Sequence, residues 1–326
     1  MAGTQALALS GAAVNVDVDS LHHYYRIHGL DEASATNVVW ERGVTRFAEL
    51  FARVGIKATF FVVTEDLERW PVARDIAAQL VAAGHELASH SHTHPYDLVR
   101  LHDKALDGEL TRSFDILSEV RGTPCAGFRA PGYTMTPRAL ARVRAAGYAY
   151  DSSIFPCPPY YLAKLAVMGL MRLRGKRSQS IIGPPSVMWD ERLPHVRDVD
   201  SSPTSRGGET DQRTETRGAM IELPITVLPG VRFPVIGSTV LMMRERGWDF
   251  IRKLVCEQPF VNLELHGIEM CDTAADGLDP RLGQQSDLKH LGLGLDHKVA
   301  LFEHVLSDLR DALGVETLED HVASLS

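Results

Sequence analysis

Two aspartates separated by one residue are the first side chains in the sequence that could do chemistry. They lie in NVDVDS (residues 15–20), at the end of an apolar run that predicts a β-strand over residues 12–18. Residues i and i+2 of a strand point to the same face, so the carboxylates of Asp17 and Asp19 are expected to emerge together. Two carboxylates this close suit a division of labour, in which one binds a cation and the other acts as a base. The alternative is an edge strand with solvated acids.

Three histidines within five residues form a second candidate cluster, in the stretch HSHTHP (residues 90–95). Imidazole nitrogens on neighbouring residues suit zinc or another late first-row divalent metal. His90 and His94 are four residues apart, a spacing that one helical turn aligns, but Pro95 disfavours a helix at His94 and makes a turn an equal expectation. His92 is a stand-in ligand. The alternative for the whole stretch is a solvated polar loop.

An arginine stands at the end of a later predicted strand, in GFRAPGY (residues 127–133). Arg129 in such a position can hold a carboxylate in place through bidentate hydrogen bonds. The Pro-Gly turn that follows frees backbone N–H groups that could face a developing oxyanion. The alternative is that the stretch is only a tight loop between a strand and a helix.

Two further polar residues stand at predicted strand ends, Asp151 in YDSS (residues 150–153) and His266 in ELHG (residues 264–267). A histidine with a carboxylate partner is a reasonable general acid near neutral pH. Taken singly, each residue is equally well explained as a helix cap or as part of the core.

Short β-rich runs alternate with helix-like segments along the chain. Strands are expected at residues 12–18, 57–63, 85–89, 125–129, 148–152, 221–227 and 260–265. Helices are expected at residues 37–54, 72–83, 106–117, 137–146 and 297–313. Alternation of this kind predicts an α/β fold built on a parallel sheet or a (β/α) barrel.

The positions of the candidate residues on this fold favour one site over scattered motifs. They all fall at the C-terminal ends of different predicted strands or in the loops that follow: Asp17, Asp19, His90, His94, Arg129, Asp151 and His266. Catalytic groups of an α/β barrel collect at that rim. The sequence therefore predicts a metal-assisted hydrolase. The histidines that follow the first aspartates, His22, His23 and His28, are further candidates to line a substrate cleft.

One region breaks the alternation, at about residues 157–220, and we interpret it as an insertion in a single domain that spans residues 1–326. Its first part, residues 158–178, is apolar and then basic; the basic residues are Lys164, Arg172, Arg174, Lys176 and Arg177. This part is expected either to pack on the barrel as a helix or to lie on a membrane surface as a peripheral contact. Residues 198–218 are polar and are expected to form a loop.

Composition excludes several classes of partner and compartment. The 326 residues carry 34 Lys and Arg against 42 Asp and Glu, a formal net charge of −8, which argues against a nucleic-acid partner. No run of 18 apolar residues occurs, so no transmembrane helix is expected. The four cysteines form no CxxC pair and the first residues include no basic signal region, which predicts a cytoplasmic protein, with the inner face of the membrane as the alternative place.

The order of these motifs resembles that of the NodB-homology polysaccharide deacetylases, carbohydrate esterase family four. NVDVDS is similar to the first motif of the family, in an Asp-x-Asp form, and KATFFVV to the strand that follows it. GHELASHSHTHP resembles the His-x-x-x-His-Pro metal motif, and GFRAPGY the Arg-x-Pro motif. YDSS and LELHG are similar to the fourth and final motifs. The resemblance covers residues 12–152 and 221–272.

The resemblance implies a distorted, seven-stranded NodB-like barrel and a role for each site residue. Asp19, His90 and His94 are the implied metal ligands, Asp17 the general base with Arg129 orienting it, His266 the general acid with Asp151 tuning it, and backbone N–H groups near Gly132 and Tyr133 the oxyanion donors. The sequence departs from the family pattern at Val18, which separates the two aspartates, and after Asp151, where the usual acid and aromatic residue are missing.

The implied reaction is hydrolysis of an N-acetyl or N-formyl amide on an amino sugar, with Zn²⁺ as the metal and Co²⁺, Ni²⁺ or Mn²⁺ as alternatives. The substrate could be free, polymeric or lipid-linked, the last resembling the lipid-linked formamido-arabinose deformylases. Two other classes stay open: a metal-free hydrolase of ureides or cyclic imides, and a carbohydrate-binding protein without catalysis.

Overall fold

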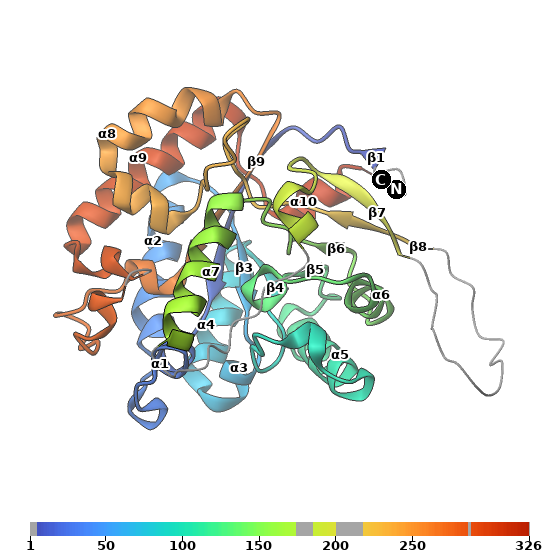
Figure 1. Cartoon of the computed structure of the whole chain (residues 1–326), viewed down its shortest axis with the longest axis horizontal. Helices are drawn as coiled ribbons and strands as arrows, with labels where there is room; N and C mark the ends of the chain where they lie inside the picture. The colour runs from blue at the N-terminus through green and yellow to red at the C-terminus, as the bar shows by residue number, and fades with distance from the viewer. Residues whose placement is uncertain (1–4, 174–184, 200–217, 286–287, 326) are drawn as a thin grey trace.

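One nine-stranded sheet organises the parts of the chain that the computed structural model describes, residues 5–173, 185–199, 218–285 and 288–325 (Figure 1). Its strand order is β1-β7-β8-β6-β5-β4-β3-β2-β9. The strands are β1 (Gln5–Ala6), β2 (Gly11–Val18), β3 (Thr59–Val62), β4 (Glu86–Ser89), β5 (Gly127–Phe128), β6 (Tyr150–Asp151), β7 (His195–Val199), β8 (Gly218–Glu222) and β9 (Phe260–His266). Every neighbouring pair from β8 to β9 is parallel, and β7 is antiparallel to both β1 and β8.

Helices surround the sheet and connect its parallel strands. The α-helices are α1 (Leu21–His28), α2 (Thr45–Val54), α3 (Glu65–Arg69), α4 (Pro71–Ala82), α5 (Asp103–Arg121), α6 (Pro137–Ala145), α7 (Pro158–Leu173), α8 (Gly237–Cys256), α9 (Leu295–Leu313) and α10 (Leu318–Ala323). Shorter helical turns are η1 (Glu32–Ser34), η2 (Val39–Val44, a π-helix), η3 (Leu98–Arg100), η4 (Pro131–Tyr133), η5 (Pro185–Trp189), η6 (Gly267–Met270), η7 (Leu282–Gln284) and η8 (Lys289–Gly292).

The sheet closes into a barrel through isolated contacts between β9 and the segment that follows β8. The backbone N–H of Thr226 donates to the carbonyl of Asn262 at 3.1 Å, and Ile236 forms a parallel bridge with Glu264. β7 pairs with the edge of β8 that does not pair with β6. The expected barrel of seven parallel strands is therefore confirmed, and its distortion lies at this seam.

The strands are buried on both faces because helices cover the outside while side chains fill the inside. All eight residues of β2 are buried, as expected for a central strand of a parallel sheet. Inside the barrel, Ala13, Phe61 and Ala88 pack with Tyr150. The larger core lies between the sheet and the surrounding helices and contains Phe47, Phe60 and Trp248, among others.

The register of the strands brings their C-terminal ends to one rim. Asp17 of β2 lies opposite His266 of β9 and opposite Phe61 of β3, and Phe128 of β5 lies opposite Asp151 of β6. The five loops that follow these strand ends therefore begin on the same side of the barrel. This arrangement is what places the candidate residues close together.

The elements expected from the sequence are present, with one clear shift. The strand expected at residues 221–227 is β8, which ends at Glu222. Pro224 explains the shift, because proline has no N–H to donate to a ladder. Helices α1, α3, α8 and α10 were not expected from the sequence, and the exposed side chains of α8 include Phe250.

The inserted region contributes α7, which packs on the barrel rim. Tyr161 donates from its hydroxyl to the carbonyl of Tyr133 at 3.4 Å, and the Lys164 ammonium lies 3.5 Å from the carbonyl of Gly132. These contacts favour the interpretation of a packed helix. Three of the basic residues, Arg174, Lys176 and Arg177, and most of the expected polar loop, residues 200–217, lie outside the described residues. Among the helices that are described, none is long and apolar enough to cross a membrane.

Candidate metal-dependent active site

One carboxylate and two imidazoles converge at the rim of the barrel. The Asp19 Oδ1 atom lies 3.2 Å from Nε2 of His94 and 3.5 Å from Nε2 of His90. All three side chains are buried, and their ligand-type atoms lie within 4.8 Å of one another. Asp19 Oδ1 and His94 Nδ1 have no hydrogen-bond partner among the described residues. Burial raises the pKa of Asp19, but His94 and His90 outweigh it and hold that pKa well below its usual range.

His90 is held in the orientation that a metal ligand needs. Its Nδ1 atom lies 2.9 Å from the carbonyl oxygen of Arg129, which can only accept, so Nδ1 carries the proton. Its Nε2 lone pair then faces Asp19. Burial lowers the pKa of His90 against the opposing effect of Asp17 and Asp19. Two imidazoles and a carboxylate fit a zinc-type divalent cation, and one of the imidazoles, that of His90, is fixed by a carbonyl.

The histidine loop is a turn and not part of a helix. Ser91 and His94 both adopt left-handed backbone conformations, with φ of 66° and 55°. Glu109 of α5 holds the loop by accepting from the backbone N–H groups of His92 at 3.0 Å and Thr93 at 2.8 Å. The ring of His92 faces away from the cluster, because its Nδ1 lies 3.0 Å from the Thr64 hydroxyl. The turn thus places His90 and His94, but not His92, beside Asp19.

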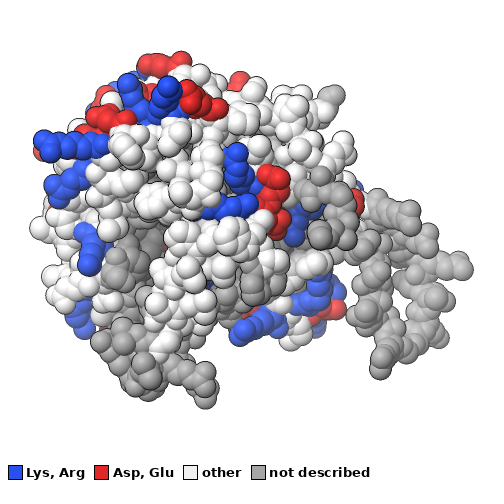
Figure 2. Space-filling model, turned by 45° about the horizontal axis from the view of Figure 1, so that its top comes forward, with Lys and Arg blue, Asp and Glu red and all other residues white. Residues whose placement is uncertain are grey.

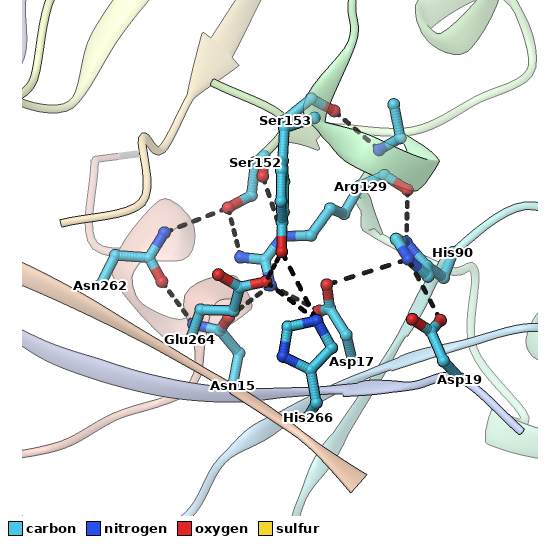
Figure 3. A network of polar contacts seen from close by, with 12 residues as sticks. Asn15, Asp17, Asp19, His90, Arg129, Ser152, Ser153, Asn262, Glu264 and His266 are labelled. Carbon is cyan, nitrogen blue, oxygen red and sulfur yellow. Dashed lines mark hydrogen bonds and ion pairs between the residues drawn. The ribbon is translucent and has the colours of Figure 1, made fainter. Parts of the chain in front are cut away.

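Arg129 is completely buried and orients Asp17 (Figure 3). One guanidinium nitrogen, Nη1, donates to Asp17 Oδ1 at 2.6 Å and to Asn15 Oδ1 at 2.5 Å. The other two nitrogens donate to the carbonyl and the hydroxyl of Ser152, at 2.9 and 2.8 Å. The expected bidentate grip on one carboxylate is therefore wrong, because the guanidinium divides its donors among three residues.

His266 stands between two carboxyl groups, those of Glu264 and Glu269, that were not among the expected site residues. Its Nε2 lies 3.7 Å from Glu264 Oε1, and its Nδ1 lies 3.9 Å from Glu269 Oε1. The Tyr133 hydroxyl is 3.5 Å from the same Nε2. The i, i+2 spacing that drew attention to Asp17 and Asp19 also relates Glu264 to His266, so the signal was present in the sequence.

Glu264 is the most constrained of these carboxyl groups. It accepts a hydrogen bond from the Tyr133 hydroxyl and lies in a common cluster with Asp17 and His266. Burial raises the pKa of Glu264 well above its usual range, and Asp17 raises it further, while Arg129 opposes them. The raised pKa favours the protonated form of Glu264, whose O–H can donate toward Asp17.

Asp151 does not take the position expected for a partner of His266. Its carboxylate accepts a hydrogen bond from the Ser153 hydroxyl at 2.5 Å, and that hydroxyl in turn accepts from the backbone N–H of Ala130 at 2.8 Å. Burial raises the pKa of Glu222, and the neighbouring Asp151 raises it further. Asp151 thus supports the loop that follows β5, and the carboxyl groups beside His266 are those of Glu264 and Glu269.

The backbone near Gly132 and Tyr133 is tightly turned, as the Pro-Gly pair predicts. Gly132 has a φ of 67° and Tyr133 a φ of 57°. The N–H of Tyr133 already donates to the carbonyl of Ala130 at 3.1 Å. In this conformation the N–H of Tyr133 does not serve as a free oxyanion donor, which corrects that part of the expectation.

A single cavity of about 240 Å³ brings most of the candidate residues together. The residues expected from the sequence that line it are Asp17, Asp19, His90, His94, Gly132, Tyr133 and His266. Arg129 and Asp151 are not among the described residues that line it. Tyr24, Tyr96 and Tyr160 add aromatic surface to the wall. The arrangement can hold a divalent cation beside one carboxylate and one imidazole that face the same space.

Comparison with known proteins gives matches to one family. Residues 35–150 match the family model for polysaccharide deacetylases. The peptidoglycan deacetylase-like protein FGM2 of Gibberella zeae is 26% identical over 148 residues, 43% of this chain and 43% of that protein. The peptidoglycan deacetylase of Helicobacter pylori is 24% identical over 156 residues, 46% of this chain and 52% of that protein. The chain spans about half the length of the curated relatives it matches.

Solved structures share the fold over nearly the whole chain. A candidate polysaccharide deacetylase from Mycobacterium smegmatis superposes with a TM-score of 0.58 at 16% identity, covering 98% of this chain and 93% of that one. Puue allantoinase superposes with a TM-score of 0.53 at 15% identity, covering 96% and 89%. Identities this low speak for the fold alone.

The fold and the cluster at its rim together define a class of protein. It is a (β/α) barrel with an aspartate–histidine cluster at the C-terminal ends of its strands. With the match over residues 35–150 added, this part of the chain is similar to the polysaccharide deacetylase family, the group that the motifs resemble. Its place in an Asp-x-Asp branch of that family stays a prediction.

Proposed function

We propose that the protein is a metal-dependent hydrolase that removes an N-acyl group from an amino sugar. An acetyl group is favoured over a formyl group. The observation that carries the proposal is the cavity in which Asp19, His90 and His94 lie beside Asp17 and His266. The names of the relatives from Gibberella zeae and Helicobacter pylori favour an amino-sugar polymer over a lipid-linked sugar.

Asp19, His90 and His94 are the residues we propose to hold the cation, with Zn²⁺ favoured by two imidazoles and one carboxylate. A divalent cation at such a site polarises the amide carbonyl and lowers the pKa of water. The carbonyl of Arg129 fixes His90 from behind, so the same residue that orients Asp17 also orients a ligand. Arg129 thereby links the two halves of the site.

Asp17 is the general base in this proposal and His266 the general acid. The Asp17 carboxylate takes the proton of the attacking water, and Arg129 keeps the carboxylate pointed into the cavity. His266, on the neighbouring strand and partly exposed to the cavity, donates a proton to the leaving amine. Glu269 fixes the position of His266 by accepting from its backbone N–H at 3.1 Å.

The negative net charge of the chain fits a neutral sugar substrate better than a polyanion. The chain carries a formal net charge of −8. On the face shown in Figure 2, lysine and arginine side chains stand beside aspartates and glutamates and are not gathered into one block. The tyrosines of the cavity wall offer rings for stacking against a sugar face.

The direct test measures acetate or formate release together with bound metal. Wild-type protein is expected to release acetate from N-acetylated amino-sugar oligomers, and to lose that activity on treatment with a chelator and regain it with Zn²⁺. Asp19→Ala and His90→Ala are expected to abolish activity and the metal bound at this site, because each removes a ligand. His304→Ala, on the exposed face of α9, is the matched control.

Two outcomes would overturn the proposal. One is full amidase activity in the chelated protein and in both ligand variants. The other is hydrolysis of allantoin or a cyclic imide with no release from any N-acylated amino sugar, which would assign the barrel to the ureide hydrolases.

The proton on Glu264 makes a separate prediction for the same assay. Glu264→Gln is expected to keep kcat within a few-fold of wild type, because an amide can donate to Asp17 and accept from Tyr133 as the protonated acid does. Glu264→Leu removes both bonds and is expected to lower kcat about 10- to 100-fold, the worth of a hydrogen bond to a charged group. If kcat measured near pH 7 falls equally in both variants, Glu264 acts as a carboxylate instead.

A further inference from the structure

A second group of ligand-type side chains lies next to the first, on α1 and α3. His22 and His23 come from α1, and Asp66 comes from α3. Their ligand-type atoms lie within 4.8 Å of one another. The two histidines are 1% exposed and Asp66 is 0% exposed. None of the three is among the described residues that line the substrate cavity.

These side chains are buried with their polar atoms unpaired. Among the described residues, neither ring nitrogen of His22 nor of His23 has a hydrogen-bond partner, and Asp66 Oδ1 has none. Buried polar groups are normally paired, so unpaired side chains that each bring one ligand-type atom into a common cluster call for a further partner. A cation that takes one lone pair from each of three side chains supplies such a partner.

Asp66 is positioned as the carboxylate ligand of a metal site is. Its Oδ2 atom accepts hydrogen bonds from the Trp40 indole N–H at 3.1 Å and from the Ser20 hydroxyl. Both donors bind one oxygen and leave the other, Oδ1, without a hydrogen-bond partner among the described residues. Carboxylates that bind metals are normally held by hydrogen-bond donors in this way, and the donors fix the direction of the free oxygen.

We propose that His22, His23 and Asp66 bind a second divalent cation, of the zinc type by its two nitrogens and one oxygen. Three protein ligands leave a fourth position for water. Because the site is buried and outside the substrate cavity, its cation is structural: it ties α1 to α3 behind the active site. The proposal does not depend on the reaction assigned to the first site.

The second site also contacts the first through imidazole rings that are tilted against one another. The ring centroid of His23 lies 4.7 Å from that of His94, and the ring centroid of His22 lies 3.9 Å from that of His23. A cation that fixes His23 therefore restricts the ring of His94. His22, His23 and Asp66 are positioning residues for the active site in this view.

The test counts metal with each site removed in turn. Asp66→Asn keeps the size of the side chain and an acceptor for Trp40, but its amide nitrogen has no lone pair for a cation. Zinc is measured by elemental analysis after equilibration with buffered Zn²⁺. We expect two ions per chain in wild type, one in Asp66→Asn, one in Asp19→Asn and none in the double variant; His304→Gln, an exposed histidine of α9, should retain two.

A second measurement keeps the proposal testable where a variant folds poorly. In the Asp19→Asn background, Zn²⁺ is expected to raise the thermal unfolding midpoint, and adding His22→Gln should remove that rise, because only a ligand bound to the native state stabilises it. Equal zinc content in Asp19→Asn and in the double variant, or no zinc-dependent rise in the Asp19→Asn background, would overturn the second site. Loss of metal only in Asp66→Asn would instead overturn the first.

Discussion

Replacing Asp17 with asparagine is expected to lower kcat for amide hydrolysis by about 10²- to 10⁴-fold, the range that a positioned general base contributes. Asparagine keeps the volume of the side chain and an oxygen for the Arg129 hydrogen bond, which is 2.6 Å long in the native protein. It has no basic oxygen that can take a proton from water. The loss should therefore fall on kcat, with KM little changed.

Metal content and a distant control separate this result from simple damage to the site. Zinc bound to Asp17→Asn should equal that bound to the wild type, because the proposed ligands Asp19, His90 and His94 are untouched. Asp311→Asn, on the exposed side of α9, should leave kcat unchanged. A kcat within threefold of wild type in Asp17→Asn would show that another group accepts the proton.

Replacing Arg129 with methionine is expected to lower the free energy of unfolding by about 3–5 kcal/mol, the cost of breaking a buried ion pair from one side. Arg129 is 0% exposed, and its guanidinium lies 4.0 Å from the centre of the Phe61 ring. Methionine fills much of the apolar space but leaves the charge of Asp17 and the oxygens of Asn15 and Ser152 without their donor. Unpaired buried groups of this kind are costly.

The measurement is urea unfolding, compared with a surface arginine that also makes an ion pair. Arg74→Met breaks the ion pair between Arg74, whose side chain is 38% exposed, and Glu119, whose side chain is 72% exposed. This change should lower the free energy of unfolding by about 1 kcal/mol or less. Equal losses in the two variants would mean that the buried network contributes nothing beyond an ordinary surface pair.

Local patterns predicted most of the barrel and the residues of the first candidate metal site. The two-residue period placed Asp17 and Asp19 on one side of a strand end, and the strand–helix alternation placed that end beside His90 and His94. The sequence does not decide whether His94 lies in a helix or in a turn, because the four-residue spacing favours a helix and Pro95 disfavours one. The left-handed backbone at His94 shows that it lies in a turn.

What could not be predicted depends on side chains far apart in the sequence. Asn15 and Asn262 are 247 residues apart, and their hydrogen bond exists only because β2 pairs with β9. Asp66 reaches the histidines of α1 only through the packing of α3. Asp151 was misplaced because strand position alone does not say whether a carboxylate faces a cavity or a neighbouring loop.

The seam that closes the barrel affects where the barrel can open locally. Between β2 and β3 a continuous ladder resists separation, whereas the segment after β8 meets β9 through isolated contacts at Thr226 and Ile236. Local opening costs least where few hydrogen bonds must break. Glu264 and His266 are on the β9 side of that seam, and His266 lines the cavity, so an opening at this junction would widen one wall of the cavity.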